Sequence, residues 1–491
     1  IDHSHRLTKP LIRLENAPKG LNVDPSNPMS HFREASWEEA MTFAANGFRG
    51  RGREVAGFGS AKCTNEEAYL FQKFIRQGFG HNNVDHCTRL CHASSVAALM
   101  ENVGSAAVTA TFNEIENADV AIIIGANPTE NHPVAATYFK QFTKRGGKLI
   151  VMDPRGQALK RHSSHMLQFK PGADVSMLNA IMHVIVEEGL YDSDYVAKYT
   201  ENWEAQKEHL KDFSPEKMAP ICGIDAEMLR DVARTFANAK AGMIFWGMGV
   251  SQHIHGTDNS RCLISLAFMT GNVGKSGAGL HPLRGQNNVQ GASDAGMIPM
   301  FLPDYQPVSD DGVRSAFTEV WKSEDFSSER GLTVVEIIEA IHQDSIKAMY
   351  ILGENPAMSD PDVEHARAAL AKLDHLVVQD IFLTETANYA DVILPASAFA
   401  EKTGTVTNTN RQVQMGRTAV SPPGEAREDW AITVDLAQRC GLNWNYSHPK
   451  QVFAEMKLNM ASLDNITWDR LEAENVVTYP SLSPTDPGQA I

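Results

Sequence analysis

A strand–turn–helix–strand unit that occurs twice is the feature that most constrains the fold of this chain. Residues 118–153 contain an apolar run, a Gly-x-Asn-Pro turn, a helical stretch and a second apolar run that ends in Asp. Residues 348–380 repeat the same order, and the step from the turn Asn to the final Asp is 26 residues in the first unit and 25 in the second. Continuous apolar runs joined by helices are typical of parallel strands covered on both faces. The pattern therefore predicts an α/β fold with an internal duplication, although any two βαβ units share a similar period.

Polar side chains follow the strand ends of both units. They are Asn127, Glu130, Asp153, Arg155, Glu354, Asn355, Gln379 and Asp380. Ligands of open α/β sheets bind outside the carboxyl ends of the strands, and an Asp at the end of the second strand can accept from a ribose or a purine edge. Two such units predict two similar polar ligands across a pseudo-two-fold axis. Neither unit carries G-x-G-x-x-G, and Gly247-Met248-Gly249 is a weak match, so an ordinary NAD site in this chain is disfavoured.

The segment between residues 82 and 95 concentrates reactive side chains between two predicted helices. The upstream helix begins with a capping-box pattern, Thr64 with Glu67 three residues later. Cys91 precedes the downstream helix, whose N-terminal dipole favours a thiolate, and a thiolate is a ligand for soft transition metals. Three other interpretations stay open: a small buried cysteine, a zinc site with Cys87 and His92, and a cysteine nucleophile.

A third informative stretch, residues 283–294, is rich in glycine and amide side chains and predicts a loop. Apolar residues flank it on both sides, which favours a loop that lines a pocket over one in bulk solvent. Within it, Arg284 offers a bidentate donor pair for a carboxylate.

Composition excludes several classes of protein. The 491 residues carry 44 Lys and Arg against 60 Asp and Glu, and the net charge of −16 argues against nucleic-acid binding. No run of 18 apolar residues occurs, so no transmembrane helix is predicted. Six mostly isolated cysteines form no disulfide framework, which favours a cytoplasmic location.

Four motifs, in order along nearly the whole chain, carry a resemblance to a known family. They are NNVDHCTRLCH at 82–92, GMGVSQ at 247–252, TGNVG at 270–274 and RGQNNVQG at 284–291. Together they resemble the molybdopterin oxidoreductases, and within them the catalytic (alpha) subunit of a molybdenum-dependent, NAD-linked, cytoplasmic formate dehydrogenase.

The resemblance implies a formate dehydrogenase/DMSO reductase-like fold with two Rossmann-like αβα domains. It implies molybdenum (or tungsten) held by two molybdopterin guanine dinucleotides, with Cys91 as the protein ligand to the metal, Arg284 on the formate carboxylate and His92 orienting groups or relaying a proton. The cofactor-binding residues that it implies are Asn127, Glu130, Asp153, Arg155, Gly172, Asp174, Met248, Gln252, Gln286, Gly353, Glu354, Asn355, Gln379, Asp380 and Thr384.

The chain departs from the family at both ends. Family members carry a [4Fe-4S] cluster on an N-terminal cysteine pattern that is not found in this sequence, and a C-terminal domain over the pterins is also expected to be missing. The predicted domains are framework segments 1–50 with 399–491, one αβα domain of 51–86 with 287–398, and a second of 87–286. Iron–sulfur and flavin diaphorase subunits are the implied partners, and electrons would pass through iron–sulfur clusters to NAD.

Two alternatives keep the fold and change the function. The same site could act on another small oxyanion of the nitrate or arsenite type. A large subunit of complex I type keeps the fold as a scaffold without the metal, but such a scaffold need not retain Cys91, His92 and Arg284.

Overall fold

The computed structural model describes residues 3–20, 22–24 and 26–490 and divides into two units. Unit 1 comprises 1–89, 286–408 and 412–488, and unit 2 comprises 90–285, 409–411 and 489–491. Residues 1, 2, 21, 25 and 491, which belong to the predicted framework segments, lie outside the described residues. The separation of a framework from the αβα part of unit 1 stays a prediction.

Unit 2 is built on a five-stranded sheet of order β7-β6-β5-β8-β9, in which all neighbours are parallel. The strands are β5 (Val120–Ile124), β6 (Lys148–Met152), β7 (His165–Leu167), β8 (Gly242–Trp246) and β9 (Gly279–Pro282). Alternate residues of β5 enter two different cores: Ile122 and Ile124 lie in one, Ala121 and Ile123 in the other. The sheet is therefore covered on both faces, as its apolar strands predict.

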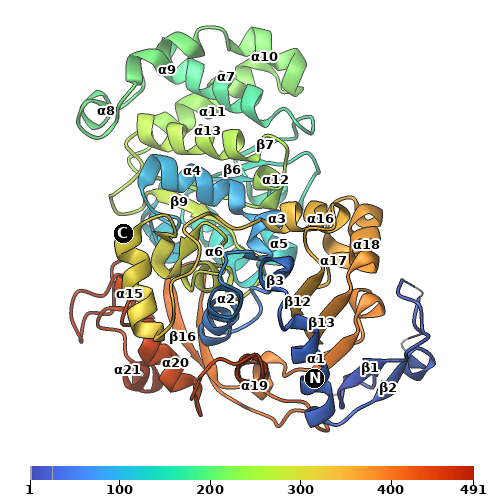
Figure 1. Cartoon of the computed structure of the whole chain (residues 1–491). Helices are drawn as coiled ribbons and strands as arrows, with labels where there is room; N and C mark the ends of the chain where they lie inside the picture. The colour runs from blue at the N-terminus through green and yellow to red at the C-terminus, as the bar shows by residue number, and fades with distance from the viewer. Residues whose placement is uncertain (1–2, 21, 25, 491) are drawn as a thin grey trace. The chain divides into compact units, whose positions relative to one another are not determined.

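Helices form the outer layers of unit 2. They are α4 (Ala93–Val103), α5 (Pro128–Asn131), α6 (Pro133–Lys144), α7 (Asp174–Glu187), α8 (Ser193–Tyr199), α9 (Trp203–Leu210), α10 (Pro215–Cys222), α11 (Ala226–Ala237), α12 (Met248–Ser251) and α13 (Gly256–Met269). Helix α7 packs against α10, α11 and α13, and α13 packs against α4 (Figure 1). Phe139 and Phe142 of α6 pack on the opposite face, against β5 and β6.

Unit 1 contains a seven-stranded sheet of order β2-β1-β14-β13-β12-β3-β4. Its strands are β1 (Leu11–Arg13), β2 (Phe32–Glu34), β3 (Val55–Gly59), β4 (Val84–His86), β12 (Ala348–Leu352), β13 (His375–Asp380) and β14 (Val392–Pro395). The five strands from β14 to β4 are parallel, and β1 and β2 extend the sheet in antiparallel fashion. Smaller sheets pair β10 (Phe301–Leu302) with β11 (Gln306–Pro307), and β16 (Gln412–Gly416) with β15 (Gly404–Thr407) and β17 (Val476–Thr478).

The helices of unit 1 complete its layers. They are α1 (Trp37–Phe48), α2 (Asn65–Phe79), α14 (Val289–Asp294), α15 (Asp311–Trp321), α16 (Val334–His342), α17 (Pro356–Ser359), α18 (Val363–Lys372), α19 (Asp429–Arg439), α20 (Pro449–Met456) and α21 (Trp468–Glu474). Helix α2 packs against α19 and α20, and their apolar residues share one core with β12. Helix α3 (Thr88–Cys91) lies where the chain leaves unit 1 for unit 2.

Most predicted elements are confirmed, with one correction. The strands at 120–124, 148–152 and 348–352 are present, and the capping box of Thr64 and Glu67 begins α2. The prediction of a loop throughout 283–294 is wrong, because Val289–Asp294 forms α14 and is buried. The small and amide residues there pack closely, and a Cβ on Gly291 would lie 1.9 Å from the Asn65 Oδ1 atom. No helix among the described residues combines the length and the apolar character needed to cross a membrane.

Candidate active site

The topological switch point of unit 2 lies between β5 and β8. From β5 the chain moves outward through β6 to β7, and it then returns to the other side of β5 through β8 and β9. A crevice forms where such a chain reverses direction, outside the carboxyl ends of the two strands. The turns that begin at Gly125 and Gly247 occupy this position.

Glycines allow these two turns to touch. Gly125 has a φ of +57°, and a Cβ added to it would lie 2.7 Å from the backbone nitrogen of Val250. A Cβ on Gly247 would lie 2.6 Å from the carbonyl oxygen of Gly125, and one on Gly249 would lie 2.8 Å from the Gly125 Cα. The Gly-Met-Gly sequence is therefore explained by close backbone approach at the switch point.

Cys91 is placed beside this crevice. It ends α3, is buried, and lies two residues before Ala93, the first residue of α4. The hydroxyl of Ser251, at the end of α12, donates to the Cys91 carbonyl oxygen at 2.9 Å. This bond ties the cysteine backbone to the turn that follows β8.

His92 is fully buried and held at both ring nitrogens. Its Nε2 lies 3.0 Å from the Leu283 carbonyl oxygen, so Nε2 carries the proton and donates. Its Nδ1 lies 3.2 Å from the hydroxyls of both Ser95 and Ser251. Burial, together with the nearby Arg284 cation, lowers the pKa of His92 to about 3, so the imidazole is neutral at physiological pH.

Arg284 lies on the segment that leaves β9. It is buried, its Nη2 donates to the Ala106 carbonyl oxygen at 3.0 Å, and its own carbonyl oxygen accepts from His132 Nε2 at 2.7 Å. The hydrogen bond between His92 and Leu283 joins two segments of unit 2, one with Cys91 and His92 and the other with Arg284. The structure thus brings together the three residues predicted to be catalytic.

Buried acceptors surround the rest of this edge. Asp174, at the start of α7, is buried, and its Oδ1 has no hydrogen-bond partner among the described residues. The same holds for the Oε1 of Gln157, whose Nε2 donates to the Ala126 carbonyl oxygen at 2.7 Å. Gln157 was not predicted from sequence, because it follows the strand at a distance that no motif marks. Burial raises the pKa of both Asp153 and Asp174.

The remaining predicted residues of unit 2 are more exposed. Glu130, Arg155, Gly172 and Met248 lie at the surface. Gln252 is also exposed, and its Nε2 donates to the Leu90 carbonyl oxygen. Asn127 is buried at the start of α5, and its Oδ1 accepts from the Thr129 hydroxyl at 2.7 Å.

Unit 1 has its own switch point, between β3 and β12. The chain passes from β3 to β4 on one side and from β12 through β13 to β14 on the other. Gly353 follows β12 with a φ of +67°, and its absent Cβ would lie 3.2 Å from the Ser60 Cβ. Asn355 then begins α17, and its side chain is bonded to Glu385 and Thr386.

Three carboxyl groups gather at this edge of unit 1. Burial raises the pKa of Glu354, and it raises the pKa of Asp380 to about 6. Burial, followed by the charge of Glu354, raises the pKa of Asp360 to about 7. Glu354 Oε1 and Asp360 Oδ1 have no hydrogen-bond partner among the described residues, and neither do Thr384 Oγ1 and Gln286 Oε1.

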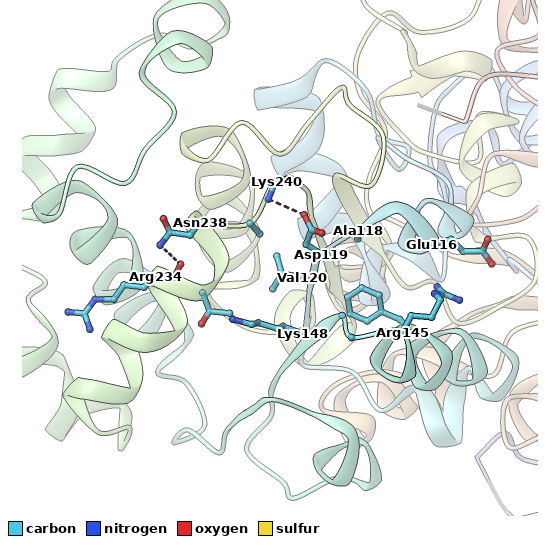
Figure 2. A pocket seen from close by; sticks show the side chains of 14 residues that line it. Glu116, Ala118, Asp119, Val120, Arg145, Lys148, Arg234, Asn238 and Lys240 are labelled. Atoms are coloured by element: carbon cyan, nitrogen blue, oxygen red, sulfur yellow. Dashed lines mark hydrogen bonds between the residues drawn. The ribbon is translucent and has the colours of Figure 1, made fainter.

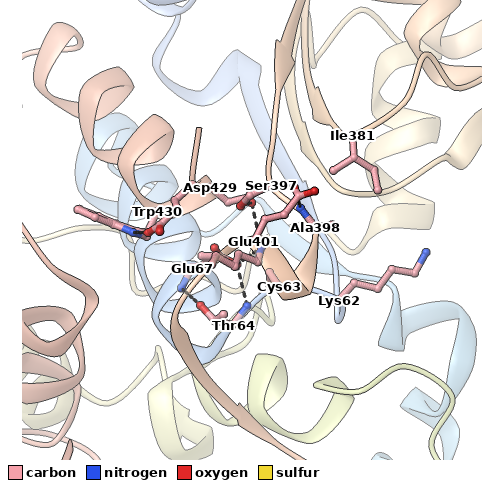
Figure 3. Close-up of polar contacts among 12 residues, drawn as sticks. Lys62, Cys63, Thr64, Glu67, Ile381, Ser397, Ala398, Glu401, Asp429 and Trp430 are labelled. Atoms are coloured by element: carbon pink, nitrogen blue, oxygen red, sulfur yellow. Dashed lines mark hydrogen bonds and ion pairs between the residues drawn. The ribbon is translucent and has the colours of Figure 1, made fainter. Parts of the chain in front are cut away.

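The Gln379 side chain takes part in a buried hydrogen-bond network. Its Oε1 accepts from the Tyr350 hydroxyl, and its Nε2 donates to Asp429 Oδ1 at 2.8 Å. The other oxygen of Asp429 accepts from Ser397 at 3.0 Å and from Lys402 Nζ at 2.9 Å (Figure 3). Lys402 also donates to Glu67 Oε2 at 2.8 Å, which completes the network.

The chain belongs to the molybdopterin oxidoreductase family, since the family model described as "Molybdopterin oxidoreductase" matches residues 6–439. The F420-dependent formate dehydrogenase subunit alpha of Methanocaldococcus jannaschii is 43% identical over all of this chain and 70% of its own length. Formate dehydrogenase H of Escherichia coli is 35% identical over 99% of this chain and 67% of its own length. The solved structure of acetylene hydratase from Pelobacter acetylenicus shares the fold, with a TM-score of 0.77, 20% identity, and coverage of all of this chain and 69% of that one.

The donor set fits the cofactor that this family implies. In the part of the chain that the structure describes, no group of three or more His, Cys, Asp and Glu side chains could hold a metal ion. A centre with a single thiolate ligand, whose other ligands come from a cofactor, needs no such group. Asp174 and Gln157 in unit 2, and Glu354 and Asp360 in unit 1, each have a buried acceptor oxygen that suits an N–H donor.

Proposed function

We propose that this chain is the catalytic subunit of a formate dehydrogenase that oxidises formate to CO2. The observation that carries the proposal is the connection of Cys91, His92 and Arg284 within one unit through the Leu283 carbonyl oxygen. The names of the relatives support it, because each of the two reported is called a formate dehydrogenase. Both are longer than this chain, so the activity of the whole protein is part of the proposal.

The proposed cofactor is molybdenum or tungsten with two molybdopterin guanine dinucleotides, one nucleotide arm at each switch point. Cys91 would supply the thiolate ligand. Asp174 and Gln157 would accept from one arm, and Glu354 and Asp360 from the other, since one side-chain oxygen of each is buried and has no hydrogen-bond partner among the described residues. When bound, this cofactor supplies the acceptor for two electrons.

Formate binds through its carboxylate to the Arg284 guanidinium. An arginine fork matches a carboxylate in geometry and charge, and it offsets the repulsion that a chain of net charge −16 exerts on an anion. Breaking the C–H bond releases CO2, one proton and two electrons, which balances the reaction. Arg284 is therefore the catalytic residue that orients the C–H bond.

His92 acts as a positioning residue in this proposal. A neutral imidazole whose two nitrogens already contact the Leu283 carbonyl and two serine hydroxyls holds the Cys91 segment against the Arg284 segment. A pKa of about 3, lowered first by burial, leaves little capacity to accept a proton at neutral pH. The predicted proton relay through His92 stays a prediction that a pH profile tests.

The electron acceptor is the finer part of the proposal. The family resemblance implies NAD, reached through [4Fe-4S] clusters and diaphorase subunits in the cytoplasm, whereas one of the relatives is named F420-dependent. Among the described residues of this chain, none is assigned to the binding of NAD or of F420. Assays of the purified complex with NAD and with F420, one at a time, distinguish the two.

Formate-dependent reduction of a viologen dye tests the reaction itself. We expect turnover in the metal-loaded wild-type protein and a loss of at least about a thousandfold in Cys91→Ala. Metal analysis and the melting temperature of both proteins serve as controls. A loaded, folded wild-type protein that ignores formate but reduces nitrate or oxidises arsenite would contradict the proposed substrate. A folded wild-type protein that takes up no metal would favour the scaffold alternative.

A further inference from the structure

Unit 2 contains a pocket at the edge of the sheet opposite the candidate active site. It has a volume of about 720 Å³ and lies at the amino-terminal ends of β5, β6 and β8 (Figure 2). The site residues follow the carboxyl ends of the same strands, which are five residues long, or roughly 16 Å. This pocket is therefore separate from the nucleotide-binding edge of unit 2.

Cations dominate the wall of the pocket. Arg145, Lys148, Arg234 and Lys240 line it, against the carboxylates of Glu116 and Asp119. Asp119 is already engaged, because its Oδ2 accepts from the backbone nitrogens of Lys240 at 3.1 Å and of Ala241 at 3.2 Å. Arg234 is ion-paired outward with Glu188 and Glu227. Three cations therefore remain without an ion pair among the described residues.

Helix capping explains only some of these charges. Arg145 follows the last residue of α6, and Arg234 lies in the last turn of α11, where a cation stabilises the helix dipole. Lys148 begins β6, and Lys240 precedes β8, so no helix end accounts for them. In Figure 2 Val120 lies between Lys240 and Lys148. Both lysines line the pocket and are exposed to solvent.

The surroundings of the pocket are also basic, although the chain as a whole is acidic. Residues 140–148 and 158–162 contain six Lys and Arg and no Asp or Glu, whereas the net charge of the chain is −16. The loop after η4 (Ala158–His162) returns to this edge, where Ser164 N donates to the Leu149 carbonyl oxygen. Such a concentration of positive charge attracts anions and raises their local concentration.

The floor of the pocket is apolar. Val120 and Phe142 line it and are buried, and Ala118 and Ala239 add further apolar surface. A volume within the range of about 300–1,000 Å³ and a mixture of apolar floor and charged rim are typical of sites for small organic ligands.

We propose that this pocket binds a phosphate-bearing small molecule of the nucleoside diphosphate class. The three cations of its wall that have no ion pair among the described residues match a ligand with at least two negative charges. The phosphates would lie among Lys148, Lys240 and Arg145, and the organic part would cover Val120 and Phe142. The proposal does not depend on the proposed reaction, because it concerns the opposite edge of the sheet.

Calorimetric titration of the purified holoenzyme with ADP tests the proposal, because in the holoenzyme the cofactor nucleotide sites are filled. The pocket variant is Lys148→Gln/Lys240→Gln. The matched control is Lys211→Gln/Lys217→Gln, which removes the same charge from exposed lysines elsewhere in unit 2. We expect ADP affinity to fall at least about tenfold in the pocket variant and less than about twofold in the control, with equal melting temperatures. Binding should also weaken as salt is raised.

Two further probes separate the phosphate groups from the organic part. Pyrophosphate should bind more weakly than ADP, and adenosine should not bind, if both the rim and the floor contribute. Pyrophosphate that binds as tightly as ADP would overturn the nucleotide class. The site itself would be overturned by undetectable ADP binding, by ADP binding that persists in the pocket variant, or by equal losses in the two variants.

Discussion

The two switch points share a backbone conformation but differ in how their side chains are used. Gly125 and Gly353 have φ angles of +57° and +67°. Asn127 and Asn355 each precede a four-residue helix that begins with proline, with φ of −116° and −127°. The Gly-x-Asn-Pro sequence thus specifies the same turn twice, as a duplication of one supersecondary unit predicts.

The difference lies in what surrounds each turn. Asn355 donates to Glu385 and accepts from Thr386, so both ends of its amide are satisfied within unit 1. The Asn127 Oδ1 atom accepts from the Thr129 hydroxyl. Unit 2 adds the Cys91–His92 and Arg284 segments, and unit 1 adds a buried charged network. The two units therefore share one turn, while the neighbouring elements give each turn different side chains.

Breaking the network of unit 1 should produce the largest loss of stability. Lys402 lies between Glu67 and Asp429 and is buried with them. Removal of the cation by Lys402→Met leaves two buried carboxylates unpaired, which should destabilise the protein by about 3–5 kcal/mol. The melting temperature measures this loss. Lys347→Met, which removes an exposed pair with Glu54, should change stability by less than about 1 kcal/mol. Equal effects of the two substitutions would show that the buried network is not a stabilising feature.

After Cys91→Ala, the chemistry assigned to unit 2 should respond most strongly to Arg284→Ala. Loss of the guanidinium removes the carboxylate contact during binding and reaction, so kcat/KM for formate should fall by about a hundred- to a thousandfold. Arg284→Lys should recover part of this loss, because it restores charge without the bidentate geometry. The surface variant Arg261→Ala is the control, since Arg261 is half exposed and pairs with Glu101. An Arg284→Ala enzyme within about twofold of wild type would contradict the assigned role.

Much of this comparison could be predicted from sequence, because apolar strands and Gly-x-Asn-Pro turns are local signals. The positions of β5, β6 and β12, and the capping box at Thr64, follow from such signals. The helix α14 could not be predicted, because its glycine and amide residues have weak helix propensity and are ordered by tertiary packing.

Other features of the site could not be predicted, because they depend on contacts between residues far apart in the sequence. The pairing of Gln379 with Asp429 joins residues 50 positions apart, and the bond from His92 to Leu283 spans 191. The buried acceptors Gln157 and Asp360 follow their strands without any motif that marks them. A polar residue after a strand is therefore a candidate ligand, but its availability depends on partners that only the fold supplies.

Glycine substitutions sharpen the comparison between the two turns. Gly125→Ala places a Cβ 2.7 Å from the backbone of Val250, whereas Gly353→Ala places one 3.2 Å from the Ser60 side chain. Both substitutions place an alanine in the left-handed region, which costs about 1 kcal/mol. Only Gly125→Ala also displaces the backbone of the neighbouring turn. We expect Gly125→Ala to destabilise the protein by about 2 kcal/mol more than Gly353→Ala, as measured by thermal unfolding. Equal losses would mean that the close approach of the turns in unit 2 is easily relaxed.

The smallest expected effect concerns the pH dependence of stability in the cofactor-free protein. The pKa of Asp360 is raised from its ordinary value near 3.8 to about 7, mainly by burial and then by the Glu354 charge. The folded state therefore binds more protons than the unfolded state between about pH 4 and pH 7, so this residue makes stability fall as pH rises through that window.

Asp360→Asn removes the ionisation, so the variant should match wild type near pH 4 and become progressively more stable than wild type as the pH rises to 7. Melting temperatures across this range measure the difference. Glu319→Gln, an exposed change on α15, should leave the profile of wild type unaltered. An Asn variant that loses stability with pH as steeply as wild type would show that Asp360 is ionised in the folded protein. An ionised Asp360 would repel an electron-rich group of a nucleotide arm. Its Oδ1 atom would accept from an N–H donor, which is the role proposed for it.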